Sequence, residues 1–283
     1  VRKQNNMWVR TAYVILFLLL CSCTEDVVKP GNISDIALYS EEGVWDKSVT
    51  ALKNMFEWMD LSVTLIDAED INSNALDGFD IICFPGGDMY RYSQRITNNG
   101  TSNIKTFLQN GGGYIGICGG AYYSAETIIW QGSQLQMNCL GLFEGTARGT
   151  VDTIVPYPRY GMCRVVITDT THPVTRNIDV DQWILYYWGP VLTPAKPDIT
   201  VLAKYDAVDL PAMLAFEYGE GKVFLAGTHP EIEEDSDRDG VVFADTTING
   251  THYDSDENLD DRGSDWNMMK NAVEWLMDNK ELR

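Results

Sequence analysis

Cys118 is the residue of this sequence best placed to act as a nucleophile. It ends an apolar run inside the glycine-rich stretch 111–125 and is followed by Gly119 and Gly120, a pattern typical of a strand that turns sharply into a helix. Such a turn holds the side chain above the sheet, and the amides at the helix start favour a thiolate and an oxyanion. The alternative is a packed cysteine in a glycine-rich turn, because free cysteines are among the most buried residues.

A nucleophilic cysteine needs a base, and the sequence contains three histidines. His172 lies in a turn-like setting and His252 in an acidic segment. His229 follows an apolar, strand-like run and precedes Glu231 by two residues, so the carboxylate can accept from the far imidazole nitrogen. Because residues just past the carboxyl ends of parallel strands meet at one edge of the sheet, we expect Cys118, His229 and Glu231 to form a catalytic triad there.

Two further groups of residues belong to the expected site. Gly86 and Gly87 end another strand-like run, and we expect their N–H groups to form an oxyanion hole with Gly119. Each of these motifs also has a plainer interpretation: Gly86 and Gly87 as an ordinary turn, His229 as a hydrogen-bonded structural residue, and Glu231 as a solvated carboxylate. Proximity to these motifs places four residues in the substrate pocket: Tyr90, Arg91, Tyr122 and Trp188.

The elements that must position these residues are strands that alternate with helices in the first half of the chain. Apolar runs predict strands, and apolar positions at helical spacing predict helices. The expected strands are 33–40, 62–66, 79–84, 151–155, 164–168, 183–188, 199–205, 212–218 and 222–226, and the expected helices are 44–59, 102–110 and 266–277. The alternation predicts an α/β fold, a three-layer flavodoxin-like sandwich with a mostly parallel central sheet, in a single domain over 33–283.

The first residues are typical of a processing signal. Basic residues precede the apolar run 12–20, which is too short to span a bilayer. Cys23 follows in a context that resembles a bacterial lipobox, with Cys21 where a small residue is usual. We therefore predict a lipoprotein signal peptide over 1–23 and a polar tether over 24–32, which would place the protein in the cell envelope, periplasmic or surface-exposed. An ordinary cleaved signal or an uncleaved anchor is the alternative.

Charge and cysteine content limit the partners and the bonds that are expected. A net charge of −20 argues against nucleic acid, because phosphate backbones bind clustered lysines and arginines. The only membrane contact that we expect is the lipid. Cys83 lies in an apolar strand and is expected in the core, whereas Cys139 and Cys163 could form a disulfide or remain two buried thiols.

The segment 231–265 is rich in carboxylates and could hold a cation. Asp235, Asp237 and Asp239 alternate ahead of a glycine, as in a calcium loop, but the closing position is Thr246 rather than a glutamate, so an EF-hand is not supported. A solvated acidic loop that shapes the crevice and disfavours anionic substrates is the alternative. We expect no other cofactor.

Three motifs together resemble the class I glutamine amidotransferase superfamily. Residues 116–120 (GICGG) resemble its nucleophile elbow, and 229–231 (HPE) resemble the His-x-Glu element of its Cys-His-Glu triad. With 85–88 (PGGD), the pattern is most similar to the amidotransferase-like domain of biotin–protein ligases and stand-alone bacterial proteins. Tyr122 departs from the family, whose glutamine-using members commonly carry a substrate-holding Gln there, and no ammonia-accepting synthetase domain is recognised.

The resemblance implies the fold and the triad more strongly than it implies glutaminase activity, and it implies no biotin ligation. The expected chemistry is thiolate attack by Cys118 on an amide or acyl carbonyl of an unknown small-molecule or peptide substrate. Two alternatives stay open: a non-catalytic, ligand-binding surface lipoprotein that retains the fold, and a cysteine peptidase.

Overall fold

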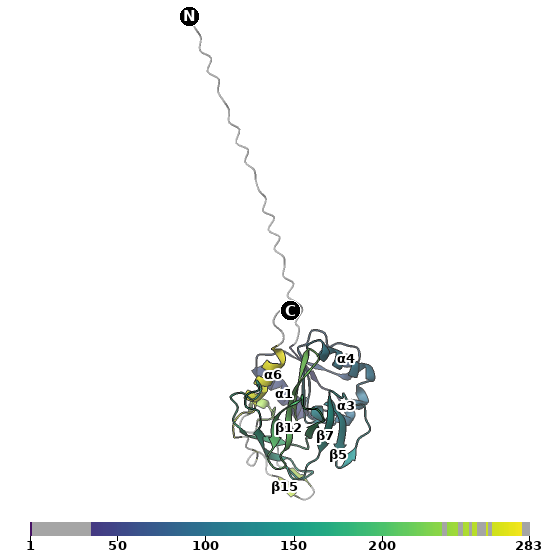
Figure 1. Cartoon of the computed structure of the whole chain (residues 1–283), viewed down its shortest axis with the longest axis vertical. Coiled ribbons are helices and arrows are strands. Elements are labelled where there is room, and N and C mark those ends of the chain that lie inside the picture. Colours follow the sequence, from purple (N-terminus) through teal and green to yellow (C-terminus); the bar gives the residue numbers. More distant parts are fainter. Residues whose placement is uncertain are drawn as a thin grey trace. The chain divides into compact units, whose positions relative to one another are not determined.

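The structure is a computed structural model that describes Val1 and residues 35–233, 237–242, 246–248, 251–253, 259 and 262–278 (Figure 1). The chain divides into two units, Val1–Asn32 and Ile33–Arg283, and every element below belongs to the second. The predicted signal peptide, tether and lipidated Cys23 lie outside the described residues, as does Asp235. Among the described helices, none has the length and apolar content needed to cross a membrane.

A nine-stranded mixed sheet forms the centre of the described part of the chain. Four neighbouring pairs of strands, from β2 to β13, are parallel, and the four pairs from β13 to β9 are antiparallel. In spatial order its strands are β2 (Val63–Ile66), β1 (Ile36–Tyr39), β3 (Ile81–Phe84), β4 (Gly113–Ile117), β13 (Gly221–Ala226), β12 (Leu210–Tyr218), β11 (Thr200–Tyr205), β8 (Gly161–Ile167) and β9 (Asp181–Tyr186).

The two faces of the parallel half are covered by different helices, as period-2 alternation requires of strands buried on both sides. Ile36 and Leu38 of β1 pack into one cluster with α1 (Asp46–Trp58) and α6 (Trp266–Met277). Ala37 and Tyr39 point into the other cluster. That second face is covered by α2 (Ala68–Asn72), α3 (Met89–Arg95), α4 (Asn98–Gln109) and α5 (Gly119–Ser124).

The predicted α/β fold with three layers is therefore confirmed, and Figure 1 shows α1 and α6 on one side and α3 and α4 on the other. The sheet is parallel only in the half that carries Cys118, because the chain after β4 returns through hairpins rather than βαβ units. The strand expected at 151–155 is wrong: these residues form turns before β8.

A second, four-stranded sheet was not expected. It packs on the α5 side through buried residues such as Ile128 and Ala147. Its strands, in the order β10-β7-β5-β6, are β10 (Val191–Pro194), β7 (Phe143–Gly149), β5 (Ala125–Trp130) and β6 (Ser133–Gln134). A separate hairpin pairs β14 (Thr246–Ile248) with β15 (Thr251–Tyr253). The second sheet matters for function because β5 leads directly from α5 to one wall of the site.

Candidate active site

Cys118 occupies the junction between β4 and α5 in a strained backbone conformation, with φ 45° and ψ −98°. Few non-glycine residues adopt positive φ, and such strain is concentrated at functional sites. Close packing holds the turn, since a Cβ at Gly120 would lie 2.2 Å from the carbonyl oxygen of Phe84. The Cys118 side chain is 6% exposed, and its exposed part faces a cavity.

His229 and Glu231 come together just beyond the carboxyl end of β13. Nδ1 of His229 lies 2.8 Å from Oε1 of Glu231, and both side chains are buried. The His229 backbone N–H donates to Leu185 O at 2.9 Å, and Trp266 Nε1 donates to Glu231 O, also at 2.9 Å. Because the Glu231 carboxylate accepts the hydrogen bond from Nδ1, Nε2 is the ring nitrogen that is available to exchange a proton with a reacting group.

Ser48, on the buried face of α1, links the carboxylate to the glycine turn. Its hydroxyl donates to Glu231 Oε1 at 2.6 Å and accepts the Gly86 N–H at 2.9 Å. The prediction that Gly86 contributes to an oxyanion hole is therefore corrected, since its only N–H is already used. Gly86 instead packs against the imidazole: a Cβ built on it would lie 2.5 Å from His229 Cε1.

Gly87 and Gly119 remain as the candidate oxyanion donors. Their backbones touch, since a Cβ at Gly119 would lie 2.4 Å from Gly87 O and 2.7 Å from Gly87 N. Neither N–H donates to an acceptor among the described residues, and the first N–H of a helix has no partner within it. Two backbone donors therefore lie beside Cys118. Since α5 has six residues, these local N–H groups, rather than a long helix dipole, provide the positive potential.

The sulfur and the imidazole interact without a direct hydrogen bond. Cys118 Sγ lies 3.4 Å from Tyr187 O, to which the thiol donates, and His229 Nε2 is buried without a hydrogen-bond partner in the described chain. Burial lowers the pKa of His229, but the Glu231 carboxylate and then the Cys118 sulfur outweigh it and raise this pKa to about 10. The imidazole is therefore protonated at neutral pH.

This raised pKa makes the stability of the fold depend on pH. The ordinary pKa of His229 is 6.5 and its folded value is about 10, so the folded chain binds the proton more tightly. The resulting stabilisation is fully present below pH 6.5 and is lost as the pH rises through about 10. We expect the urea midpoint of the native protein to fall over this range more steeply than that of His229→Gln. Parallel pH profiles for the two proteins would contradict this.

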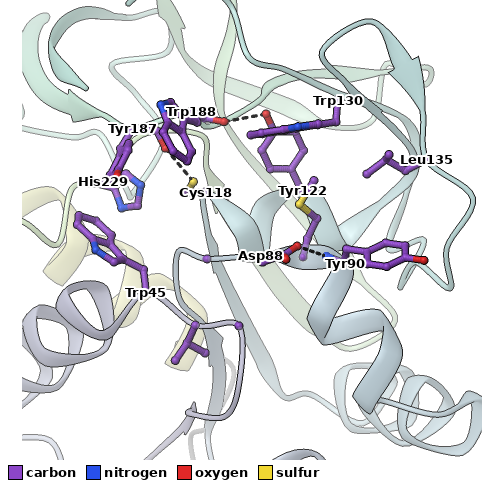
Figure 2. A pocket seen from close by; sticks show the side chains of 14 residues that line it. Trp45, Asp88, Tyr90, Cys118, Tyr122, Trp130, Leu135, Tyr187, Trp188 and His229 are labelled. Atoms are coloured by element: carbon purple, nitrogen blue, oxygen red, sulfur yellow. Dashed lines mark hydrogen bonds between the residues drawn. The ribbon is translucent and has the colours of Figure 1, made fainter. Parts of the chain in front are cut away.

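A cavity of about 690 Å³ opens in front of Cys118 (Figure 2). Of the predicted pocket residues, Tyr90, Tyr122 and Trp188 line it, and Arg91 does not, because its guanidinium turns to Gln94 and Glu42. The described residues that line the cavity are Gly43, Val44, Trp45, Gly87, Asp88, Met89, Tyr90, Cys118, Tyr122, Trp130, Leu135, Tyr187, Trp188 and His229.

Tyr122 closes one side of this cavity where glutamine-using relatives would carry Gln. Its hydroxyl donates to Trp188 O at 2.9 Å, and burial raises the pKa of Tyr122, so the ring stays neutral. Trp188 is itself held with φ 63°, and its Nε1 donates to Arg159 O at 3.0 Å. The two side chains form a fixed wall.

Sequence reasoning missed Ser48, Trp45, Tyr187, Trp130 and Leu135. Tyr187 was assigned to a strand, but β9 ends at Tyr186, and the residues that follow cross over Cys118. The only available signal was the pair Gly189-Pro190, which marks a strand end. Nothing in the sequence distinguished Ser48 from the other polar residues of its helix.

The described residues contain no group of three His, Cys, Asp or Glu side chains that could hold a metal ion. Asp237 begins a 3₁₀ turn, η1 (Asp237–Asp239), and the Asp239 carboxylate accepts the N–H groups of Glu233 and Val241. With Asp235 outside the described residues, the calcium site stays a prediction.

The cysteines that the structure describes are all free thiols. Cys83 is fully buried, as expected, and Cys163 is buried in β8, whereas Cys139 is partly exposed. The disulfide between Cys139 and Cys163 that the sequence left open is therefore not formed.

Gly86 offers a direct test of how closely the imidazole must be held. Gly86→Ala places a methyl group against the His229 ring, so we expect alkylation of Cys118 by iodoacetamide to slow by about 10-fold, because misplacement of a reacting group is costly. Gly161→Ala is the matched control, since the nearest atom to its Cβ would be 3.8 Å away. Equal rates for the two variants would show that the ring is free to shift.

Comparison with known proteins places the chain in a family. It matches the family "Biotin-protein ligase, N terminal" over residues 34–262. A biotin–protein ligase of Schizosaccharomyces pombe is 26% identical over 166 residues, which are 53% of this chain and 25% of the ligase. An uncharacterized protein of Chlamydia muridarum is 26% identical over 221 residues, 71% of this chain and 81% of that protein. The chain thus spans only a quarter of the yeast ligase.

Solved structures show the same fold. A glutamine amidotransferase superimposes with a TM-score of 0.53 at 16% identity, covering 70% of this chain and 90% of that one. A ThuA-like protein from Bacteroides uniformis gives a TM-score of 0.52 at 14% identity, covering 87% and 91%. With a fold like that of a glutamine amidotransferase and a family match over most of its length, this chain belongs to the biotin–protein ligase N-terminal family.

Proposed function

We propose that this protein is a cysteine-dependent enzyme that cleaves or transfers an acyl group from an amide. The observation that carries the proposal is the buried His229, which is held at Nδ1 by Glu231 and whose pKa is raised toward the imidazolium form beside Cys118. A thiolate paired with an imidazolium is the reactive form of catalytic cysteines. The N–H groups of Gly87 and Gly119, which donate to no acceptor among the described residues, are available to stabilise the oxyanion of such a reaction.

In the proposed reaction, the Cys118 thiolate attacks the carbonyl carbon and a C–S bond forms. The carbonyl oxygen takes up the negative charge, which the N–H groups of Gly87 and Gly119 stabilise. When the C–N bond breaks, His229 gives its Nε2 proton to the leaving amine. Water or another amine then attacks the acyl-cysteine and transfers a proton to Nε2, which releases the acid or new amide and restores the thiolate. His229 therefore acts first as an acid.

Alkylation by iodoacetamide over a pH series tests this proposal without a known substrate. We expect Cys118 to be alkylated at pH 6 to 7 much faster than a free thiol, with the modified residue identified by peptide mass spectrometry. Cys139 is an internal control, since burial raises its pKa to about 11. A Cys118 that reacts only near pH 8.5, as a free thiol does, would overturn the proposal.

One observation favours a second candidate function, a binding protein that retains the fold without turnover. The Cys118 thiol donates to Tyr187 O rather than to His229, an arrangement that leaves the sulfur protonated. An unreactive Cys118 in a chain that still binds ligand in the cavity would support this candidate. In either case, we propose that the protein acts at the cell envelope through lipid on Cys23; loss of membrane association in Cys23→Ser tests this.

A further inference from the structure

The charges around the cavity do not suit the amino-acid end of glutamine. None of the described residues that line it is a lysine or an arginine, and Asp88 places a carboxylate in the lining. Arg91 turns away, and Arg148 acts electrostatically on Tyr122 without lining the cavity. A substrate carboxylate would therefore be desolvated next to a like charge, and the described lining offers no lysine or arginine to pair with it, which is costly.

Aromatic rings instead form a continuous wall from the reacting end of the cavity to its far end. Trp45 contacts His229 with ring centroids 4.9 Å apart, and Trp45 in turn contacts Tyr187 at 5.1 Å. Tyr187 contacts Trp188 at 4.6 Å. Tyr157, outside the lining, joins Trp188 to Trp130 through ring contacts at 5.0 and 6.5 Å, and Trp130 meets Tyr122 at 5.7 Å. Such rings bind flat or apolar groups by stacking and by excluding water.

The far end of the cavity is also apolar. Figure 2 shows Cys118, His229 and Tyr187 at one end and Trp130 and Leu135 at the other. Apart from Cys118 and His229, polar side-chain groups in the described lining come from Asp88 and from tyrosine and tryptophan rings. Asp88 is already engaged, because its carboxylate accepts the Tyr90 N–H at 3.0 Å. A volume of about 690 Å³ is large enough for a drug-sized ligand.

We propose that the substrate carries a bulky, uncharged, apolar group, aromatic or long aliphatic, that extends from the reacting carbonyl along the aromatic wall to Trp130 and Leu135. This inference rests on the proposed function, since it assumes that Cys118 is the reacting atom. It assigns Trp130 and Leu135 to substrate specificity. It also accounts for Tyr122, a neutral ring that completes the wall.

Three alkylating probes that differ only beyond the reacting carbon test the substrate class. Iodoacetamide, iodoacetate and N-benzyl-iodoacetamide all form a C–S bond to Cys118 as the C–I bond breaks and iodide leaves. Each rate is divided by the rate of the same probe with N-acetylcysteine at the same pH. We expect the benzyl probe to exceed iodoacetamide by about 10-fold or more, as burial of a ring predicts, and iodoacetate to be the slowest.

Variants of the aromatic wall show whether the preference for the benzyl probe comes from contacts with the wall or from a general change in the reactivity of the thiol. Trp130→Ala should reduce the preference for the benzyl probe by about 10-fold, and Leu135→Ala should reduce it in the same direction, which provides a second measurement if the first variant does not fold. Glu126→Ala is the matched control, because Glu126 is exposed on β5, the strand of Trp130, and lies outside the cavity lining. The native preference should persist in this control.

The outcomes distinguish this inference from the proposed function. If Cys118 reacts faster than a free thiol with all probes but shows no benzyl preference, or prefers iodoacetate, the inference is overturned and the proposed function stands. If Cys118 reacts no faster than N-acetylcysteine with any probe, the proposed function fails first. A benzyl preference that survives in both Trp130→Ala and Leu135→Ala would also overturn the assignment of these two residues to substrate specificity.

Discussion

Replacing His229 with asparagine is expected to slow the alkylation of Cys118 at pH 6.5 by about 100-fold, because an unassisted thiol with a pKa near 8.5 is only about 1% ionised at that pH. Asparagine can still donate to Glu231, so the variant removes the imidazolium while keeping a hydrogen bond to the carboxylate. The same change should reduce turnover by at least as much once a substrate is known, since general acid catalysis contributes about 100-fold or more.

His172→Asn is the matched control for this experiment. His172 is partly buried, its Nδ1 accepts the Val174 N–H at 3.2 Å, and it does not line the cavity. Its replacement is expected to leave the alkylation rate of Cys118 unchanged. A His229→Asn rate within about 3-fold of the native rate would show that the imidazole does not ionise the sulfur, and the helix start and oxyanion donors would then be the remaining sources of reactivity.

The parallel half of the site could be predicted because it follows from a local rule. Apolar runs that end at Cys118, at Gly86 and shortly before His229 become strands β4, β3 and β13, and neighbouring parallel strands end at one edge. The hydrogen bond between His229 and Glu231 could be predicted because the two residues are only two positions apart. These parts depend on sequence-local signals and on one topological rule, so tertiary context did not alter them.

The rest of the site comes from elements whose positions depend on long-range packing. Tyr187 reaches Cys118 because β9, at the far edge of the mixed sheet, returns its following loop over the cavity. Trp130 belongs to a second sheet whose short strands show little alternation. Ser48 is one polar residue of an amphipathic helix, and only the position of α1 beside the Gly86 turn and the 229–231 turn gives it two partners. The sequence contains no local signal for any of these contacts.

The role of Gly86 shows how a correct motif can carry a wrong assignment. The glycine pair was expected to supply oxyanion donors, and two adjacent N–H groups at a strand end are a reasonable source of them. In the structure, Ser48 takes the first N–H, while Gly87 retains the second. Gly86 is glycine for a different reason, because the imidazole of His229 fills the space that a side chain would need.

Trp266→Ala is expected to destabilise the fold by about 3–5 kcal/mol, the usual cost of removing a buried tryptophan. Trp266 is 0% exposed, and its Nε1 donates to the Glu231 carbonyl at 2.9 Å. Its ring also packs against the Arg238 guanidinium, 4.3 Å from the ring centroid, which in turn pairs with Glu233. Removal of the indole therefore opens a cavity and releases the segment that holds the Glu231 carboxylate. Urea unfolding measures the loss.

Two variants divide this effect into its parts. Trp58→Ala removes the other ring that contacts Arg238, but Trp58 is 42% exposed, so we expect a loss of only about 1 kcal/mol and an unchanged alkylation rate. Trp266→Phe keeps most of the buried ring and leaves the Glu231 carbonyl unsatisfied, at a cost of about 1–3 kcal/mol. If α6 positions Glu231 as the contacts indicate, Trp266→Phe must also slow the alkylation of Cys118. An unchanged rate would limit Trp266 to a role in packing.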